Sequence, residues 1–288
     1  MDFDKDITST QEKTGTLAFF GSHSSQNARA FIKEIEALAC EFTLLNLKEM
    51  DEVALLNRVD TKYVMPARDL LRIFPTLQTD YRILSVHGRC LNHYRTLYFD
   101  SPEFSLYRMH VNGQAERYKV RSREYIDTQL SYLEVKHHTR KERTIKERLE
   151  TRRPVFMVTE KEESWLCEVF PYDSGSLEPK LWNTFTRITL VGRRTLERVT
   201  LDMDISFYAE ERTAYLEGFV IAEVKFDSSI SSSPFLSVMH MERLHPCGFS
   251  KYLMGVSMLY DQVKKNALKP KMLWLGKIAG GLSHEFVY

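Results

Sequence analysis

A long series of strand candidates joined by short links is the feature that most restricts how this 288-residue chain can fold. About nine segments between residues 61 and 227 have the residue types and the alternation of β-strands. The links between them, such as 101–105 and 211–218, are polar or turn-rich. Strands with short connections pair in antiparallel fashion, and so many of them favour closure into a barrel. The candidates cover residues 61–65, 81–88, 91–100, 116–125, 131–139, 144–150, 181–192, 197–209 and 218–227.

Helical patterns flank this strand region on both sides. The segment 27–42 has apolar residues at helical spacing, namely Phe31, Ile35, Leu38 and Phe42. Short helices are expected after residue 46 and over 67–77, and a final helix is expected over 249–266. We expect residues 1–28 to form a tail or linker, and we find no clear period in 270–288.

The overall charge excludes a strongly basic or acidic protein. The chain has 40 basic and 39 acidic residues, so whole-molecule attraction to nucleic acid or to an anionic membrane is not indicated. The basic stretch 139–153 contains alternating acidic residues, which argues against a nucleic-acid patch there. Hydrophobic residues make up 43% of the chain, which is enough for a packed core.

Cysteine usage and hydropathy favour a cytoplasmic protein. The four cysteines are widely spaced and form no CxxC pair, so neither a zinc cluster nor a disulfide framework is expected. The acidic, polar N-terminus lacks the features of a signal peptide. No apolar run approaches the roughly 20 residues that a membrane-spanning helix needs, so we expect no span in this chain.

Cations at alternate positions in "ERYKVRSREY" (116–125) raise the question of function. In a strand, Lys119, Arg121 and Arg123 would share one face. Such a face lies either in open solvent or against an anion. Solvated faces are ordinary for antiparallel sheets, but they usually mix charge signs because like charges side by side are destabilising. The pattern therefore favours an anion, and the solvated face stays open as the alternative.

Other strand candidates repeat this pattern. If these faces enclose one interior, the buried charges need water and anions to offset them, and phosphate suits both Arg and Lys. Carboxylates in the same interior would suit Mg²⁺ or Mn²⁺, which prefer oxygen ligands. We expect Glu223 and Glu134 on the metal side, and Arg58, Lys119 and Arg148 among the phosphate-binding cations. The residues that share faces are Glu134, Lys136 and His138; Lys146 and Arg148; Arg198, Thr200, Asp202 and Asp204; and Glu223 and Lys225.

An ordered set of motifs resembles the VTC domain. This is the catalytic domain of the polyphosphate polymerase of the vacuolar transporter chaperone, a triphosphate tunnel metalloenzyme related to CYTH proteins. The resemblance covers roughly 44–262, with 1–43 as an N-terminal tail and helix and 263–288 as a C-terminal tail. The motifs are "NRVDTKYV", "YRTLYFDS", "YKVRSREY", "LEVKHHTRKERTIKER", "ERVTLD", "IAEVKF" and "FSKY".

The resemblance implies an α+β fold, with a closed antiparallel eight-stranded β-barrel that forms a tunnel and is flanked by helices. It implies transfer of the γ-phosphate of ATP to a polyphosphate chain, with Mn²⁺ or Mg²⁺ held by Glu223. Ser250 and Lys251 would bind phosphate near one mouth, where a helix begins. The cations implied along the phosphate path are Lys62, Arg121, Arg123, Lys136, Lys146, Arg187, Arg198 and Lys225.

Two departures bear on which branch of the superfamily the chain joins. Polymerase members carry a lysine three residues before that of the "SK" pair, whereas this chain has Gly248. The ExExK opening of CYTH triphosphatases is also absent, and "RVDTKY" supplies only Asp60, which favours the polymerase branch. A tunnel tri- or polyphosphatase and a non-catalytic module that binds polyphosphate or inositol phosphates stay open. ATP and polyphosphate are the expected ligands, and coupling to a membrane would need a partner protein.

Overall fold

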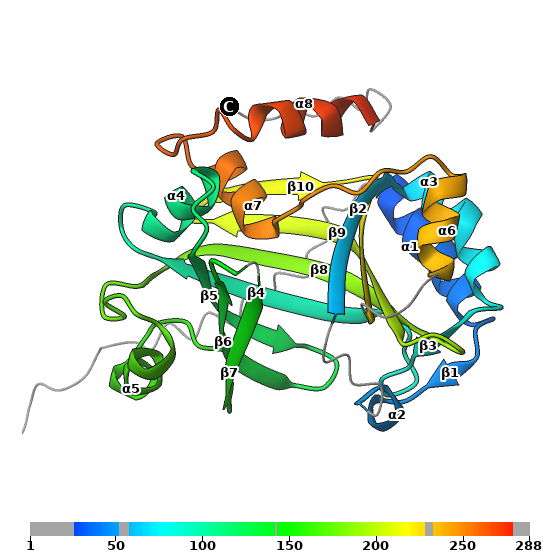
Figure 1. The fold of residues 1–288 in the computed structure, drawn as a ribbon, viewed down its shortest axis with the longest axis horizontal. Helices are drawn as coiled ribbons and strands as arrows, with labels where there is room; N and C mark the ends of the chain where they lie inside the picture. The colour runs from blue at the N-terminus through cyan, green and yellow to red at the C-terminus, as the bar shows by residue number, and fades with distance from the viewer. Residues whose placement is uncertain (1–25, 52–57, 142, 228–232, 279–288) are drawn as a thin grey trace, which may run out of the picture.

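A large antiparallel sheet organises the molecule (Figure 1). The computed structural model describes residues 26–51, 58–141, 143–227 and 233–278. Every neighbouring pair along the main path of the sheet is antiparallel. In spatial order this path runs through β2 (Arg58–Pro66), β11 (Phe219–Asp227), β9 (Glu197–Ala209), β8 (Glu178–Gly192), β4 (Asn92–Asp100), β5 (Arg117–Tyr125), β6 (Leu130–His138) and β7 (Thr144–Thr151).

Three further strands extend this sheet. β10 (Arg212–Leu216) pairs with β9 in the segment expected to be a turn-rich link, so that expectation was wrong. β3 (Tyr81–Leu84) pairs with β8, and the two-residue β1 (Leu44–Leu45) pairs with β3 in parallel. Each of the predicted strand segments contains a strand of the structure, so the prediction of an α+β fold with a large antiparallel sheet and flanking helices is confirmed.

The predicted closure of the barrel is wrong for the strands that the structure describes. The path ends at β2 on one side and at β7 on the other, and no ladder joins these two edges. β7 is exposed along most of its length. Lys62 of β2 pairs in register with Glu223 of β11, and Lys146 of β7 pairs in register with Lys136 of β6, so each of these two strands has a partner in the path on one side alone. The sheet is therefore a curved trough.

Helices cover the convex side of the trough near its β2 end. α1 (Gln26–Ala39), α3 (Ala67–Ile73), the 3₁₀ turn Phe74–Leu77 and α6 (Pro234–Met241) lie together there (Figure 1). Their buried side chains, including Ile35 and Phe235, pack against Val199 and Leu201 of β9. Burial of each such side chain contributes about 1.5–3 kcal/mol. Because side chains alternate along β9, the residues between these apolar ones face the trough.

A second group of helices covers the other end of the sheet. α4 (Ser105–Val111), α7 (Lys251–Leu259) and α8 (Lys269–Ile278) share one apolar cluster with β8 and β9. α7 comes especially close to the sheet at Gly255, where an added Cβ would lie 2.6 Å from side-chain atoms of Leu181 and Phe207. The helix ends at Leu259, seven residues before the predicted end at 266.

The remaining helices fall partly outside the predictions. α5 (Glu160–Val169) packs its Leu166 against Leu97, Val120 and Leu133 of the sheet. α2 (Leu47–Asp51) begins where a helix was expected, and the continuation of that segment over 52–57 lies outside the described residues. The expected tail over 1–28 lies almost wholly outside them too. None of the helices in the described residues has the length and apolar composition that a bilayer crossing requires.

Candidate functional site

Basic side chains from most strands of the path gather on the concave face of the trough. The register sets Glu223 of β11 opposite both Lys62 of β2 and Thr200 of β9, and it sets Arg187 of β8 opposite Asp202. Arg123 of β5 and Arg187 lie over the same two rings, Tyr94 and Phe185. Strands far apart in sequence thus bring most of the predicted cations to this face: Lys62, Lys119, Arg121, Arg123, Lys136, Lys146, Arg187 and Lys225.

Three lysines form one continuous row across adjacent strands. Lys119 of β5 lies opposite Lys136 of β6, which lies opposite Lys146 of β7. Burial, reinforced by the charges of Lys136 and Arg121, lowers the pKa of Lys119 to about 7. Burial also lowers the pKa of Lys136 to about 8, even though Glu223 opposes this shift. Directly opposed like charges destabilise a sheet, so this row is a place where an anion would be favoured.

The next row contains a carboxylate between cations. Glu134, whose side chain is only 1% exposed, accepts a hydrogen bond of 2.7 Å from Nε of Arg121 and contacts Lys146. Burial alone would raise the pKa of Glu134, but the charges of Arg121, Arg123 and Lys146 outweigh burial and hold this pKa well below its usual range. Glu134 is therefore a permanent anion whose two oxygens contact Arg121 and Lys146.

A second carboxylate holds cations beneath α7. Arg187 donates to Asp202 from Nε at 2.5 Å and from Nη2 at 2.8 Å, and Lys251 at the start of α7 contacts the same carboxylate. Burial opposes the charged form of Asp202, yet these two cations lower its pKa to about 2. Burial lowers the pKa of Lys251 to about 8. Ser250 caps α7 by accepting a hydrogen bond from the amide of Leu253, so the "SK" pair sits at a helix N-terminus as predicted.

A third carboxylate is the better candidate for a metal ligand. Glu223 contacts Lys62 at 3.2 Å and Lys225 at 2.5 Å, both through Oε1, and Lys225 also contacts Asp60 at 2.8 Å. Burial opposes the ionisation of Glu223, but the charges of Lys225 and Lys62 hold the pKa of this carboxyl well below the usual value. Among the described residues no three His, Cys, Asp or Glu side chains group into a metal site. Glu223 alone fits the mode in which one carboxylate and substrate phosphates share Mg²⁺.

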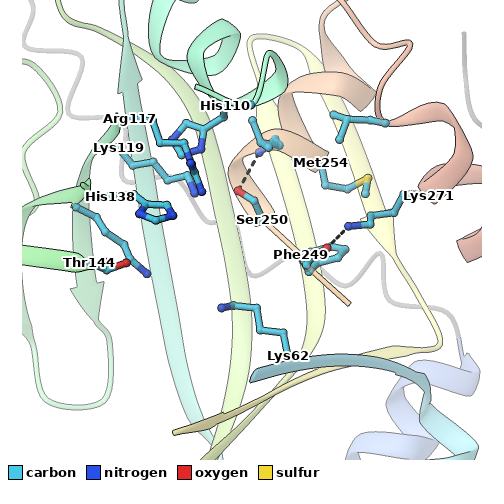
Figure 2. Close-up of a pocket in the computed structure, with 15 residues that line it drawn as sticks. Lys62, His110, Arg117, Lys119, His138, Thr144, Phe249, Ser250, Met254 and Lys271 are labelled. Atoms are coloured by element: carbon cyan, nitrogen blue, oxygen red, sulfur yellow. Dashed lines mark hydrogen bonds between the residues drawn. The ribbon is translucent and has the colours of Figure 1, made fainter. Parts of the chain in front are cut away.

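A cavity of about 540 Å³ opens where the row of lysines meets the start of α7 (Figure 2). Its lining residues include no Asp or Glu, whereas the three salt-bridged carboxylates lie outside the lining. Figure 2 shows Lys62, Arg117, Lys119 and His138 around this common space, with Ser250 and Lys271 on its far side. The cationic and polar lining side chains are Lys62, His110, Arg117, Lys119, Lys136, His138, Thr144, Ser250 and Lys271.

The predicted site residues thus fall into several positions. Lys62, Lys119, Lys136 and Ser250 line the cavity, whereas Arg121, Arg187 and Lys225, which contact carboxylates, lie outside its lining. Arg198 donates to the carbonyl of Met50 in α2 at 3.2 Å, away from the cavity. Arg148 lies over the Tyr132 ring at 4.9 Å, on the exposed edge strand, and the side chain of Arg58 is outside the described part of the chain.

Sequence reasoning missed several residues of this site. Arg117 continues the alternation of Lys119 and Arg121, so a longer reading of that strand would have included it. Asp202 was placed on a shared face with Arg198, but its role as the partner of Arg187 and Lys251 depends on contacts between distant elements. His110 and Lys271 reach the cavity from α4 and α8, and no local pattern identifies them.

Comparison with known proteins places these features in a family. The family model of the VTC domain matches residues 57–260. A sequence search among curated proteins finds no match.

Similar solved structures share little sequence with the chain. One is a candidate adenylate cyclase from Bacillus halodurans, with 11% identity, a TM-score of 0.41, and coverage of 67% of this chain and 94% of that one. Another is a candidate adenylyl cyclase from Hippeastrum described as having a dominant triphosphatase activity, with 13% identity, a TM-score of 0.41, and coverage of 69% and 95%. A conserved hypothetical protein from Pyrococcus furiosus has 15% identity, a TM-score of 0.37, and coverage of 68% and 99%.

The family match includes the strands of the concave face and the start of α7. It begins before Lys62 and ends after Lys251, so every cluster described above lies inside it. The family and the cationic trough together indicate a phosphate-handling protein of the tunnel type. Since the match extends over more than half of its length, this chain belongs to the VTC domain family.

Proposed function

We propose that the chain is an ATP-dependent inorganic polyphosphate polymerase. The observation that carries this proposal is the unbroken row Lys119–Lys136–Lys146 beside a cavity whose lining residues include no carboxylate. Lys119 and Lys136 oppose each other directly, which is unfavourable in the free protein, and a polyanion that lies along the row would offset their repulsion. A phosphate chain has the repeated negative charge that such a row requires, and Arg and Lys suit its oxygens.

Transfer of a phosphoryl group requires positioning and charge stabilisation more than covalent chemistry. A terminal oxygen of the polyphosphate chain attacks the γ-phosphorus of ATP, a new P–O–P link forms, and the bond from that phosphorus to the bridging oxygen of ADP breaks. Arg121, Arg187 and Lys251 would stabilise the charge on the transferred group, since Glu134 and Asp202 fix their positions.

The attacking oxygen is already ionised, so this reaction requires no general base. His110 would be a poor base, because burial lowers its pKa to about 3 and its Nε2 lies 3.0 Å from the carbonyl oxygen of Tyr118. Attack by water would gain more from a base than attack by a phosphate does. The acid-free lining therefore supports the polymerase over a phosphatase.

A divalent cation, Mn²⁺ or Mg²⁺, belongs to this proposal. When bound, it would neutralise charge on the β- and γ-phosphates. Glu223 would hold it, and Lys62 and Lys225 keep that carboxylate oriented toward the trough. Glu134 fits this role less well, because both of its oxygens contact cations of the protein.

The decisive test is incubation of the purified full chain with ATP and Mn²⁺ or Mg²⁺. The expected products are ADP and an acid-labile phosphate polymer that resolves on a gel. Glu223→Ala should abolish turnover, whereas Glu168→Ala on the exposed part of α5 should leave it unchanged.

Two results would contradict the polymerase. Release of orthophosphate from tripolyphosphate without polymer would identify a tunnel phosphatase. Tight binding of polyphosphate or inositol phosphates that survives Glu223→Ala, with no turnover of ATP, would identify a non-catalytic binding module. The same proposal includes a cytoplasmic location, a functional domain at 44–262 and a membrane-protein partner of the polymerase.

A further inference from the structure

α8 has two faces of different character. Its inner face packs on the sheet side through Leu275, which is buried, and through Met272, which contacts the apolar cluster shared with α4 and α7. Lys271 on this side donates to the carbonyl of Gly248 and lines the cavity. The outer face instead exposes 69% of Leu273 and 37% of Trp274, which is unusual for adjacent large apolar residues.

The exposed apolar pair lies between lysines. Lys269, Leu273 and Lys277 follow one another at intervals of four residues, so they form one stripe along the outer face. No acidic residue occurs between Asp261 and Glu285, although this part of the chain carries five lysines. The whole chain has a net charge of only +1, so this concentration of positive charge is local. The five are Lys264, Lys265, Lys269, Lys271 and Lys277.

We propose that the outer face of α8 binds the surface of an anionic lipid bilayer. Leu273 and Trp274 would enter the boundary between headgroups and acyl chains, where the indole ring of Trp is favoured. Lys269 and Lys277, one turn to each side of Leu273, would contact lipid phosphates. The long aliphatic part of each lysine allows its ammonium group to reach the headgroups while the helix lies in the interface.

Charge and side-chain type favour a lipid surface over a protein partner. A protein interface usually has few lysines at its centre, whereas lysines beside Trp and Leu are typical of helices that lie on membranes. With only two apolar anchors, the binding is expected to be reversible and to depend on the anionic lipid content. This inference does not depend on polymerase activity.

The test uses the full chain and vesicles of phosphatidylcholine with or without phosphatidylglycerol, in a flotation assay. We expect binding only to vesicles that contain the anionic lipid, with loss of binding at high salt. Lys269→Gln with Lys277→Gln should weaken this binding by about tenfold or more, since each lysine near such a surface contributes about 1 kcal/mol. Leu273→Ala should also weaken it, and a shift of tryptophan fluorescence on binding should disappear in Trp274→Phe.

Matched controls lie elsewhere on the surface. Met241→Ala removes a side chain that is 71% exposed on α6, and Lys161→Gln removes an exposed charge on α5, and neither should change vesicle binding. Thermal unfolding of each variant confirms that the fold is kept. The proposal would be overturned by equal binding to neutral and anionic vesicles, or by no binding to either kind. It would also be overturned if the chain binds no lipid and Trp274→Phe instead changes its oligomeric state.

Discussion

Lys119 on β5 lies directly opposite Lys136 on β6, and burial together with this neighbouring charge lowers the pKa of Lys119 to about 7. In the unfolded chain the same group keeps its ordinary pKa of 10.5. The unfolded state therefore binds more protons between these two values. It follows that the free energy of unfolding of the free protein contains a contribution from Lys119 that rises with pH across this window.

Polyphosphate binding should show the opposite trend with pH. A bound polyanion favours the protonated form of Lys119, so binding takes up protons between about pH 7 and 10 and weakens as pH rises. Calorimetric titrations at pH 8 in buffers of different ionisation enthalpy measure this uptake. The uptake should decrease in Lys119→Arg, whose guanidinium stays charged. An uptake that is zero in the wild-type chain would rule out this role.

Removing one lysine of the row should raise the stability of the free protein and lower its affinity for polyphosphate. Lys136→Met relieves repulsion by Lys119 and keeps most of the side-chain volume, so the free protein should melt at a higher temperature. Polyphosphate affinity should fall by about tenfold, as expected when one charge contact is lost. Lys161→Met on α5 is the matched control and should change neither quantity. Lower stability together with unchanged affinity would show that the row does not bind an anion.

Glu134→Gln should destabilise the free protein strongly. The substitution leaves Arg121 and Lys146 without their buried counter-charge, and breaking a buried ion pair in this way costs about 3–5 kcal/mol. Glu116→Gln, at a pair with the exposed Arg140, should cost at most about 1 kcal/mol. Urea unfolding measures both values. Added polyphosphate should restore part of the loss in Glu134→Gln, because it supplies negative charge to the same cations.

Two glycine substitutions on helices should have opposite effects. Gly255→Ala places a methyl group 2.6 Å from atoms of Leu181 and Phe207, so α7 must shift, at a cost of about 1–3 kcal/mol. Since Lys251 lies on the same helix, phosphate binding should weaken as well. Gly276→Ala on α8 meets nothing within 4 Å and should stabilise by up to about 1 kcal/mol through helix propensity. Equal melting temperatures of the two variants would contradict the packing described for α7.

The sequence predicted the strands well because their signal is local. Alternation of charged and apolar residues fixed the faces of Lys119, Arg121 and Arg123, and the structure sets them on the concave side as expected. β10 and α4 were missed because both are short, with five and seven residues, and their contacts with β9 and with the apolar cluster of α7 join segments that a local pattern does not connect.

Contacts between distant elements could not be predicted in the same way. Lys251 was matched to a motif, but its carboxylate partner Asp202 lies 49 residues earlier in the chain. Lys271 reaches the cavity only because α8 folds back over α7. Closure of the barrel was expected from the number of strands, but that number does not determine whether the first and last strands of the path, β2 and β7, meet.

The separated edges of β2 and β7 affect how a long molecule could reach the lysines. A closed barrel would admit a polymer only by one of its ends, so blocking both ends of the polymer would prevent entry. An open trough can bind the same polymer from the side, without threading either end of the polymer. Polyphosphate esterified at both termini should therefore still bind to this chain. If this doubly blocked polymer does not bind, polyphosphate must enter by a free end.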